Sequence, residues 1–174
     1  MTTAGPNYPS TAADGGGGNP WTNVANAKAD DGSLATATNP ADIKLTVFGF
    51  AVTAGATIDG VTCEVKHSLS AGTANAQCQI IKGGTVGGSV RNAAANTTLQ
   101  YATAGGAADL WGNTLTSTDV NAATFGIYIL MNTAGTPTYS IDAVRVTINY
   151  TLATGAKLSQ SKLVAPGVLG RLAQ

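Results

Sequence analysis

Two cysteines and a single histidine have the greatest potential for chemistry in this chain: Cys63, Cys78 and His67. Two thiols can form a disulfide, and a histidine can serve a hydrolase triad or a metal site if a nucleophile or further ligands lie nearby. Residues 61–69 and 76–81 are separated by a short turn and carry β-strand patterns, so we expect them to form one hairpin. Cross-strand neighbours have Cβ atoms about 5 Å apart, which is close to disulfide range.

The cysteine pair has two interpretations that the sequence leaves open. A disulfide between Cys63 and Cys78 would add about 3 kcal/mol of stability in the chain-entropy model. Alternatively, both are buried free thiols that pack as small hydrophobic groups, as suits a chain without a visible secretory signal. His67 shares its strand face with Val65 and Leu69, so we expect a packed or sheet-edge histidine rather than a catalytic residue. Two cysteines without a histidine cluster do not predict a zinc site.

Carboxylates and glycine-rich loops offer little further chemistry. Glu64 is the only glutamate and the aspartates are scattered, so the carboxylate pair of a glycosidase is not evident. Asp30, Asp31 and Gly32 could belong to a calcium site, but a turn is the preferred interpretation because the alternating acidic loop of an EF-hand is missing. The glycine-rich stretch 83–89 lacks the lysine and following helix of a phosphate-binding loop, so it predicts a turn. We therefore expect a protein that is not an enzyme and binds no cofactor or metal.

Two tryptophans provide the sharpest alternative, a binding surface. Exposed aromatic rings stack on sugars in lectin-like sandwiches, so Trp21 and Trp111 could contact a glycan. However, Trp21 follows Pro20 at the entry to the predicted domain, where it could cover one end of a core. Trp111 lies in a short segment, residues 109–112, between predicted turns. For both side chains we expect packing in the core or in an interface.

The elements that would position these residues are strands. Alternation or a high content of β-forming residues predicts strands over 44–52, 61–69, 76–81, 125–131 and 141–150. In the last of these, Val144, Val146, Ile148 and Tyr150 should share one face. The middle of the chain, residues 83–121, is less regular, and no stretch has helical periodicity of useful length. Many strands joined by Gly-rich turns predict an all-β fold, a jelly-roll-like antiparallel β-sandwich of about eight strands.

Composition divides the chain into three segments. Residues 1–20 contain three prolines and four consecutive glycines, which oppose both helix and strand, so we expect an extended N-terminal arm. Residues 21–152 should form the β-sandwich domain, and residues 153–174 an extended C-terminal arm. Residues 1–151 carry six basic and nine acidic groups, whereas the rest of the chain carries three basic groups and no acidic one.

Low charge and apolar surfaces indicate a subunit of an assembly. Only 10% of the residues are charged, against roughly 25% in an average soluble domain. Strand 125–131 is apolar on both faces, so Tyr128 and Leu130 would need cover, and we expect a homo-oligomer, preferably a trimer. The apolar C-terminal arm should lie along a neighbouring subunit or its own body. Its candidate partner-binding residues are Leu158, Leu163, Val164, Val168, Leu169 and Leu172.

Two classes of partner are not expected. No run of about 18 apolar residues predicts a membrane span, and the first residues show no secretory signal. The formal net charge is zero and no basic stripe alternates with aromatic residues, so nucleic-acid binding is not expected either.

The chain also resembles a known class of structural proteins. The stretches that carry the resemblance are WTNVANA (21–27), DGSLA (31–35), IDGV (58–61), TFGI (124–127) and IDAVRVTINY (141–150). In this order, over about residues 21–151, they resemble jelly-roll β-sandwich proteins of tailed-phage virions. The resemblance implies a capsid decoration (cement) subunit in the virion, assembled in the host cytoplasm, with the major capsid protein or other virion subunits as partners. The alternatives are a tail- or adaptor-associated structural protein and a carbohydrate-binding module that recognises host glycans.

Overall fold

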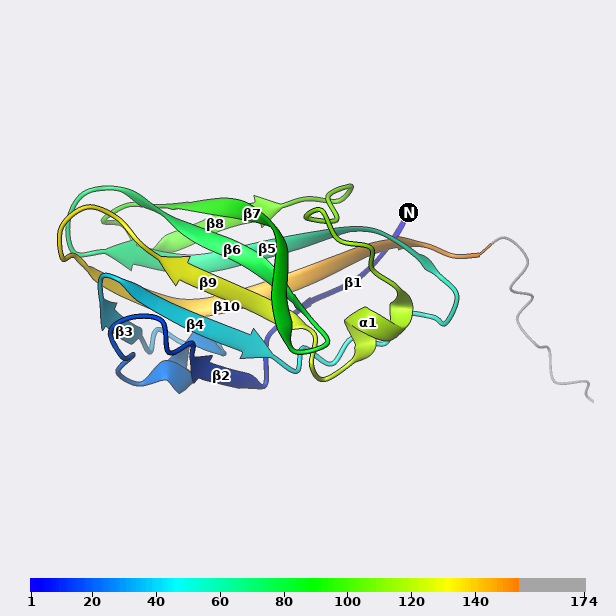
Figure 1. Cartoon of the computed structure of the whole chain (residues 1–174), viewed down its shortest axis with the longest axis horizontal. Helices are drawn as coiled ribbons and strands as arrows, with labels where there is room; N and C mark the ends of the chain where they lie inside the picture. The colour runs from blue at the N-terminus through cyan, green and yellow to red at the C-terminus, as the bar shows by residue number, and fades with distance from the viewer. Residues whose placement is uncertain (154–174) are drawn as a thin grey trace, which may run out of the picture.

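The computed structural model describes residues 1–153, which form two stacked antiparallel sheets of five strands each (Figure 1). The strands are β1 (Thr2–Asn7), β2 (Thr11–Asp14), β3 (Ala35–Thr38), β4 (Ala41–Thr46), β5 (Thr57–Leu69), β6 (Ala74–Lys82), β7 (Thr85–Ala95), β8 (Gln100–Gly105), β9 (Gly126–Met131) and β10 (Thr138–Thr151). A 3₁₀ turn, η1 (Val24–Ala27), and a short helix, α1 (Ser117–Asn121), lie in the connections.

Strands β3 to β10 have the topology of an eight-stranded jelly roll. In sheet A, β3 pairs with β10, which continues to β5 and β8; in sheet B, the order is β4-β9-β6-β7. The N-terminal strands extend this core, because β1 also pairs with β10 and β2 pairs with β4. The predicted all-β jelly-roll-like sandwich is therefore confirmed, with eight strands in the jelly roll and ten among residues 1–153.

The two longest strands form the centre of sheet A because their inward faces are continuous apolar rows. Along β10, Val144, Val146, Ile148 and Tyr150 are all buried, as predicted. They face apolar side chains of sheet B such as Ile129 on β9. Full burial of an aliphatic side chain contributes about 2 kcal/mol, so this interior supplies most of the stability of the fold.

The prediction that residues 1–20 avoid strand structure is wrong for β1 and β2. Pro6 is tolerated because β1 is an edge strand and its pairing with β10 is interrupted between Ala4 and Asn7, where no ladder hydrogen bond is needed. The glycine run lies on sheet B, where a Cβ atom at Gly15 would collide with the carboxylate of Asp42. These glycines therefore allow close packing of the chain on its own domain.

The predicted strand over residues 44–52 ends early, at Thr46. Val47 and Gly49 adopt left-handed φ angles of 60° and 67°, which take the chain out of the sheet. The rings of Phe48 and Phe50 then stack with centroids 5.9 Å apart at the end of the sandwich. Their β-forming residue types serve core packing here rather than strand pairing.

The middle of the chain is more regular than predicted. Strand β7 spans eleven residues and joins β6 through a tight turn at Gly83 and Gly84, both with positive φ. The turn predicted over residues 83–89 is therefore confirmed only for these two glycines, and it is wrong for residues 85–89, which form the start of β7, the strand that pairs with β6. The missed helix α1 begins with a capping box, in which Thr116 and Asp119 exchange side-chain and backbone hydrogen bonds.

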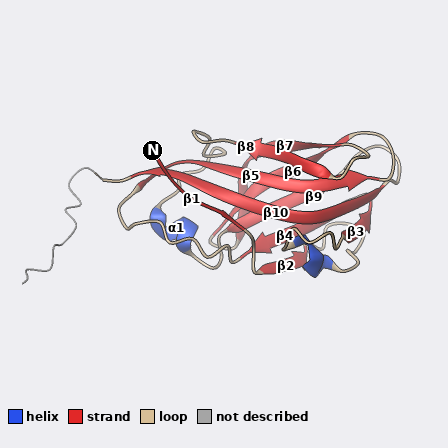
Figure 2. Ribbon diagram, turned by 180° about the vertical axis from the view of Figure 1, so that it is seen from behind, coloured by secondary structure: helices blue, strands red, loops and turns tan. Residues whose placement is uncertain are grey.

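The N-terminus and the end of the described chain lie at the same end of the sandwich, since Thr2 pairs with Tyr150 (Figure 2). In residues 1–153, no helix is long and apolar enough to cross a membrane. The predicted C-terminal arm lies outside the described residues from residue 154 onward. All of its candidate contact residues do so too: Leu158, Leu163, Val164, Val168, Leu169 and Leu172.

Candidate functional site

Cys63 and Cys78 meet across the sandwich, and the predicted hairpin is wrong. Strand β5 belongs to sheet A and β6 to sheet B, so the turn between them carries the chain from one sheet to the other. Alternation could not reveal this, because the apolar faces of both strands point into the same core. Both thiols are buried and free, and an interaction with Cys78 together with burial raises the pKa of the Cys63 thiol. The structure thus has the free-thiol arrangement.

His67 is buried on the same inward face of β5, with 1% of its surface exposed. Its Nε2 lies 3.2 Å from the carbonyl oxygen of Ala94, and its Nδ1 has no hydrogen-bond partner among the described residues. Burial lowers the pKa of His67 to about 4, so the ring is neutral at pH 7 and Nε2–H donates to the carbonyl. The predicted packed histidine is confirmed.

Both tryptophans belong to the core, as the packing interpretation predicts. Trp21 is 8% exposed and its Nε1–H donates to the backbone oxygen of Asp42 at 2.8 Å. Trp111 is fully buried and its Nε1–H donates to the backbone oxygen of Val61 at 2.8 Å. Neither ring has a face open to solvent on which a sugar could stack.

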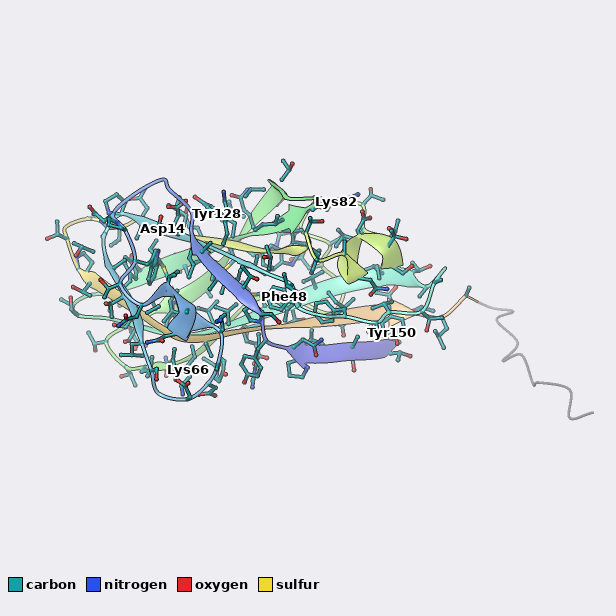
Figure 3. The ribbon with its side chains drawn as sticks, turned by 90° about the horizontal axis from the view of Figure 1, so that it is seen from below. Asp14, Phe48, Lys66, Lys82, Tyr128 and Tyr150 are labelled. Atoms are coloured by element: carbon teal, nitrogen blue, oxygen red, sulfur yellow. The ribbon has the colours of Figure 1, made fainter. Side chains whose placement is uncertain are left out.

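A connected group of polar side chains surrounds Lys66 on the outer face of sheet A, on the side of the sandwich away from Tyr128 of sheet B (Figure 3). We call it the sheet A cluster; its members are Tyr8, Asp30, Glu64, Lys66, Tyr101, Asp142 and Arg145. Lys66 is central because β5 pairs it with Ala143 of β10 on one side and Tyr101 of β8 on the other. Asp142 is the extra residue of a bulge in β10, next to Lys66. Bulges commonly redirect a side chain in this way.

Lys66 bridges two carboxylates within this cluster. Its Nζ lies 2.5 Å from Oδ1 of Asp30 and 2.7 Å from Oδ2 of Asp142. The Asp142 side chain is fully buried, and its Oδ1 accepts backbone N–H groups of Asp31 (3.3 Å) and Gly32 (3.0 Å). The contacts with Asp142 and Asp30 raise the pKa of Lys66, and Lys66 followed by Tyr101 lowers the pKa of Asp30.

The rest of the cluster holds these groups in place. The Tyr101 hydroxyl donates to Oδ2 of Asp30 at 2.9 Å and lies 3.3 Å from the Tyr8 hydroxyl. Arg145 forms a two-pronged ion pair with Glu64, with both nitrogen–oxygen distances at 2.8 Å. Its guanidinium also lies 4.1 Å from the ring centre of Tyr101. Each charged side chain of the cluster therefore has a partner of opposite charge.

The calcium hypothesis for Asp30, Asp31 and Gly32 does not fit this geometry. The Lys66 amine occupies the space between carboxylates where a cation would bind. Asp31 instead accepts the backbone N–H of Ser33 at 2.8 Å, which is the hydrogen bond of an Asx turn. Residues 1–153 contain no group of three or more His, Cys, Asp or Glu side chains that could hold a metal ion. The turn interpretation is confirmed.

The outer face of sheet B is less charged. Tyr128 and Leu130 on the central strand β9 are half-buried, and register places Tyr128 between Lys44 and Gln79. Burial and the nearby Asp42 carboxylate raise the pKa of Tyr128 to about 12, so it remains a neutral phenol. The predicted need to cover this face stays a prediction.

Three surface hollows lie around the end of the sandwich away from the N-terminus. Their volumes are about 440, 290 and 510 Å³, and turn residues such as Ser70, Thr133 and Asn96 line them. Their linings contain hydroxyl and amide groups but no titratable side chain. They can offer hydrogen bonds, but they supply no acid or base.

The sheet A cluster is the group that sequence reasoning missed. Lys66 and Asp142 are far apart in the chain and meet only through the pairing of β5 with β10. One signal was present, because Asp142 interrupts an otherwise apolar run at 141–144.

Comparisons with models of protein families, with curated proteins and with solved structures find no match to this chain.

Proposed function

We propose that this protein is a structural subunit of a virion, a capsid decoration protein that stabilises the shell through contacts between subunits. The observation that carries the proposal is the route of the chain at one end of the jelly roll. Strand β10, paired with β5 in the centre of sheet A, leads directly into the apolar, acid-free segment that ends the chain. A rigid domain with such an extension is suited to binding a neighbouring subunit.

The chemistry of the domain supports a structural role. His67, Cys63 and Cys78 are buried in the core, where other side chains rather than a substrate contact them. The charges of the sheet A cluster are paired with one another. The hollows at the far end contain no acid, base or nucleophilic thiol in their linings.

The charge distribution supports docking of the terminal segment on another subunit. Residues 1–151 have a balance of −3 and residues 152–174 a balance of +3, which sum to the net charge of zero. A basic, apolar terminal segment would be attracted to the acidic domain of a second copy, or to a shell surface of negative charge. Burial of several hundred Å² would contribute several kcal/mol at roughly 25 cal/mol per Å², before the entropy of ordering is subtracted.

Deletion of residues 155–174 tests this proposal. The truncated chain should keep its far-UV circular dichroism and melting temperature, while its binding to shells that lack the protein falls at least tenfold. Equal binding by the truncated and full-length chains would refute the proposal. Fractionation of particles into heads and tails, followed by immunodetection, separates a decoration subunit from a tail- or adaptor-associated one.

A further inference from the structure

We infer that Lys66 and Asp142 are a site of covalent self-modification, at which the Lys66 amine and the Asp142 carboxyl condense to an amide. The two groups already touch, since Nζ lies 2.7 Å from Oδ2. Asp142 is fully buried, and among the described residues the Lys66 amine is the partner that its Oδ2 contacts. A buried carboxylate oxygen that depends on one amine places the carboxyl carbon within reach of that amine nitrogen.

The other oxygen of Asp142 is held as acyl transfer requires. Oδ1 accepts the backbone N–H groups of Gly32 at 3.0 Å and Asp31 at 3.3 Å. Two such donors stabilise the negative charge that develops on oxygen when a nucleophile adds to the carboxyl carbon. The turn at residues 30–33 therefore supplies the equivalent of an oxyanion hole.

Asp30 is placed to act as the base. Its Oδ1 lies 2.5 Å from Nζ of Lys66, and its Oδ2 is fixed by the Tyr101 hydroxyl at 2.9 Å. The amine must lose a proton before its lone pair can attack, and a carboxylate in direct contact can accept that proton and pass it on. Lys66, Asp30 and Asp142 thus have the roles of nucleophile, proton shuttle and acyl group.

The step balances without any co-reactant. The Lys66 ammonium gives one proton to Asp30, and the neutral amine forms the N–C bond to Cγ of Asp142. The nitrogen then loses a second proton, the bond from Cγ to Oδ2 breaks, and Oδ2 leaves as water with both protons. Asp30 ends as a carboxylate, so the net reaction converts one ammonium and one carboxylate into one amide and one water.

The position of Lys66 and Asp142 in the fold favours the reaction and determines its rate. Both groups are fixed on neighbouring strands, and such fixation replaces the entropy that a bimolecular step would lose. The ion pair stabilises the ammonium form, so the neutral amine is a minor species and condensation should be slow compared with folding. Burial of Asp142 restricts the water that would reverse it.

The amide would join the two long central strands of sheet A. Strand β10 continues into the terminal segment, so a force on that segment would act on β10 first. A covalent link to β5 would prevent the two strands from separating. This consequence does not depend on the virion assignment.

Mass spectrometry of the full-length chain tests the inference. After the folded protein is incubated and then denatured, its mass should be lower than the sequence mass by one water molecule. Peptide mapping should recover the peptide with Lys66 joined to the peptide with Asp142. If the incubated, folded chain has its full sequence mass and the two peptides are recovered separately, the inference is overturned.

Variants assign the reaction to these residues. Lys66→Arg and Asp142→Ala should abolish the water loss, whereas Asp30→Asn should slow it about 100-fold because both bonding partners remain. Lys82→Arg is the matched control, since Nζ of Lys82 lies 3.4 Å from a carboxylate oxygen of Asp119 on the surface; it should keep the water loss. A water loss that persists in folded Lys66→Arg would come from succinimide formation at an Asp–Gly sequence and would refute the inference.

Discussion

The two outer faces of the sandwich each hold a glycine-containing loop with one buried aspartate, but the two aspartates are satisfied differently. On sheet A, Asp142 accepts two backbone N–H groups from the turn at residues 30–33 and contacts the ammonium of Lys66. On sheet B, Asp42 accepts one backbone N–H, that of Gly17 at 2.8 Å, and forms no ion pair with any of residues 1–153.

This difference shows how a chain with few charges distributes them. The face of sheet A concentrates charges in one cluster, where they fix a turn and the side chains around it. On the face of sheet B, Lys44 is the cation beside Tyr128. The side chains of Tyr128 and Leu130 are half-buried there. A face with few charges loses less hydration energy when it is covered, so sheet B is better suited to a contact with another subunit.

The largest expected effect comes from removing each aspartate in turn. Asp142→Ala should lower the free energy of unfolding by about 3 kcal/mol, because two backbone N–H groups lose a charged acceptor. Asp42→Ala should lower it by about 1.5 kcal/mol, because one N–H group is affected. Urea unfolding followed by tryptophan fluorescence measures both values. Equal losses would contradict the difference between the two faces.

The second effect is a loss of stability at acidic pH, and it comes from His67 on β5, the strand that also carries Glu64 and Lys66 of the sheet A cluster. The pKa of His67 is lowered to about 4 in the folded protein, against about 6.5 when unfolded. The unfolded chain therefore binds a proton first, so stability is fully present above pH 6.5 and is lost as the pH falls to 4. A pKa shift of this size corresponds to a loss of roughly 3 kcal/mol in the free energy of unfolding, and part of this loss should be measurable at pH 5.

His67→Gln isolates this contribution. The variant is less stable at pH 7 because it loses a packed ring, but its free energy of unfolding should change little between pH 7 and 4.5. The carboxylates of Asp30, Asp109 and Asp119 have lowered pKa values, so their contributions are lost at still lower pH. If wild type and variant have parallel pH profiles over this window, the histidine is not the acid-sensitive group.

The sequence predicted the fold because its strongest signals were those of the core strands. Val61, Val65, Val146 and Ile148 alternate with polar residues, and this period places them on inward faces. Alternation does not specify which strand pairs with which, so it predicts a hairpin of β5 and β6 although these strands belong to different sheets. Strand pairing depends on contacts between residues far apart in the chain.

The sheet A cluster and the N-terminal strands could not be predicted for the same reason, because both depend on contacts between residues far apart in the chain. Lys66 could be assigned to the exposed face of its strand, but its partners Asp30 and Asp142 come from a turn and from a bulge. Pro6 argues against a strand in general, and only an edge position with interrupted pairing makes it acceptable. Such exceptions depend on tertiary structure and leave little local signal.

The smallest effect on stability, and the sharpest test of the contrast between the faces, comes from Tyr128 and Leu130. The double variant Tyr128→Thr with Leu130→Thr should change the free energy of unfolding by only about 1 kcal/mol, because both positions are half-buried and threonine favours strands. If the face of sheet B joins copies of the chain, multi-angle light scattering should show an oligomer for the wild type and a monomer for the double variant. Thr103→Ala, an exposed change on the outer face of sheet A, is the control and should leave the oligomer intact. A wild type that is monomeric at high concentration would show that the outer face of sheet B does not join copies of the chain. A control variant that dissociates as readily as the double variant would show that the contact is not specific to sheet B.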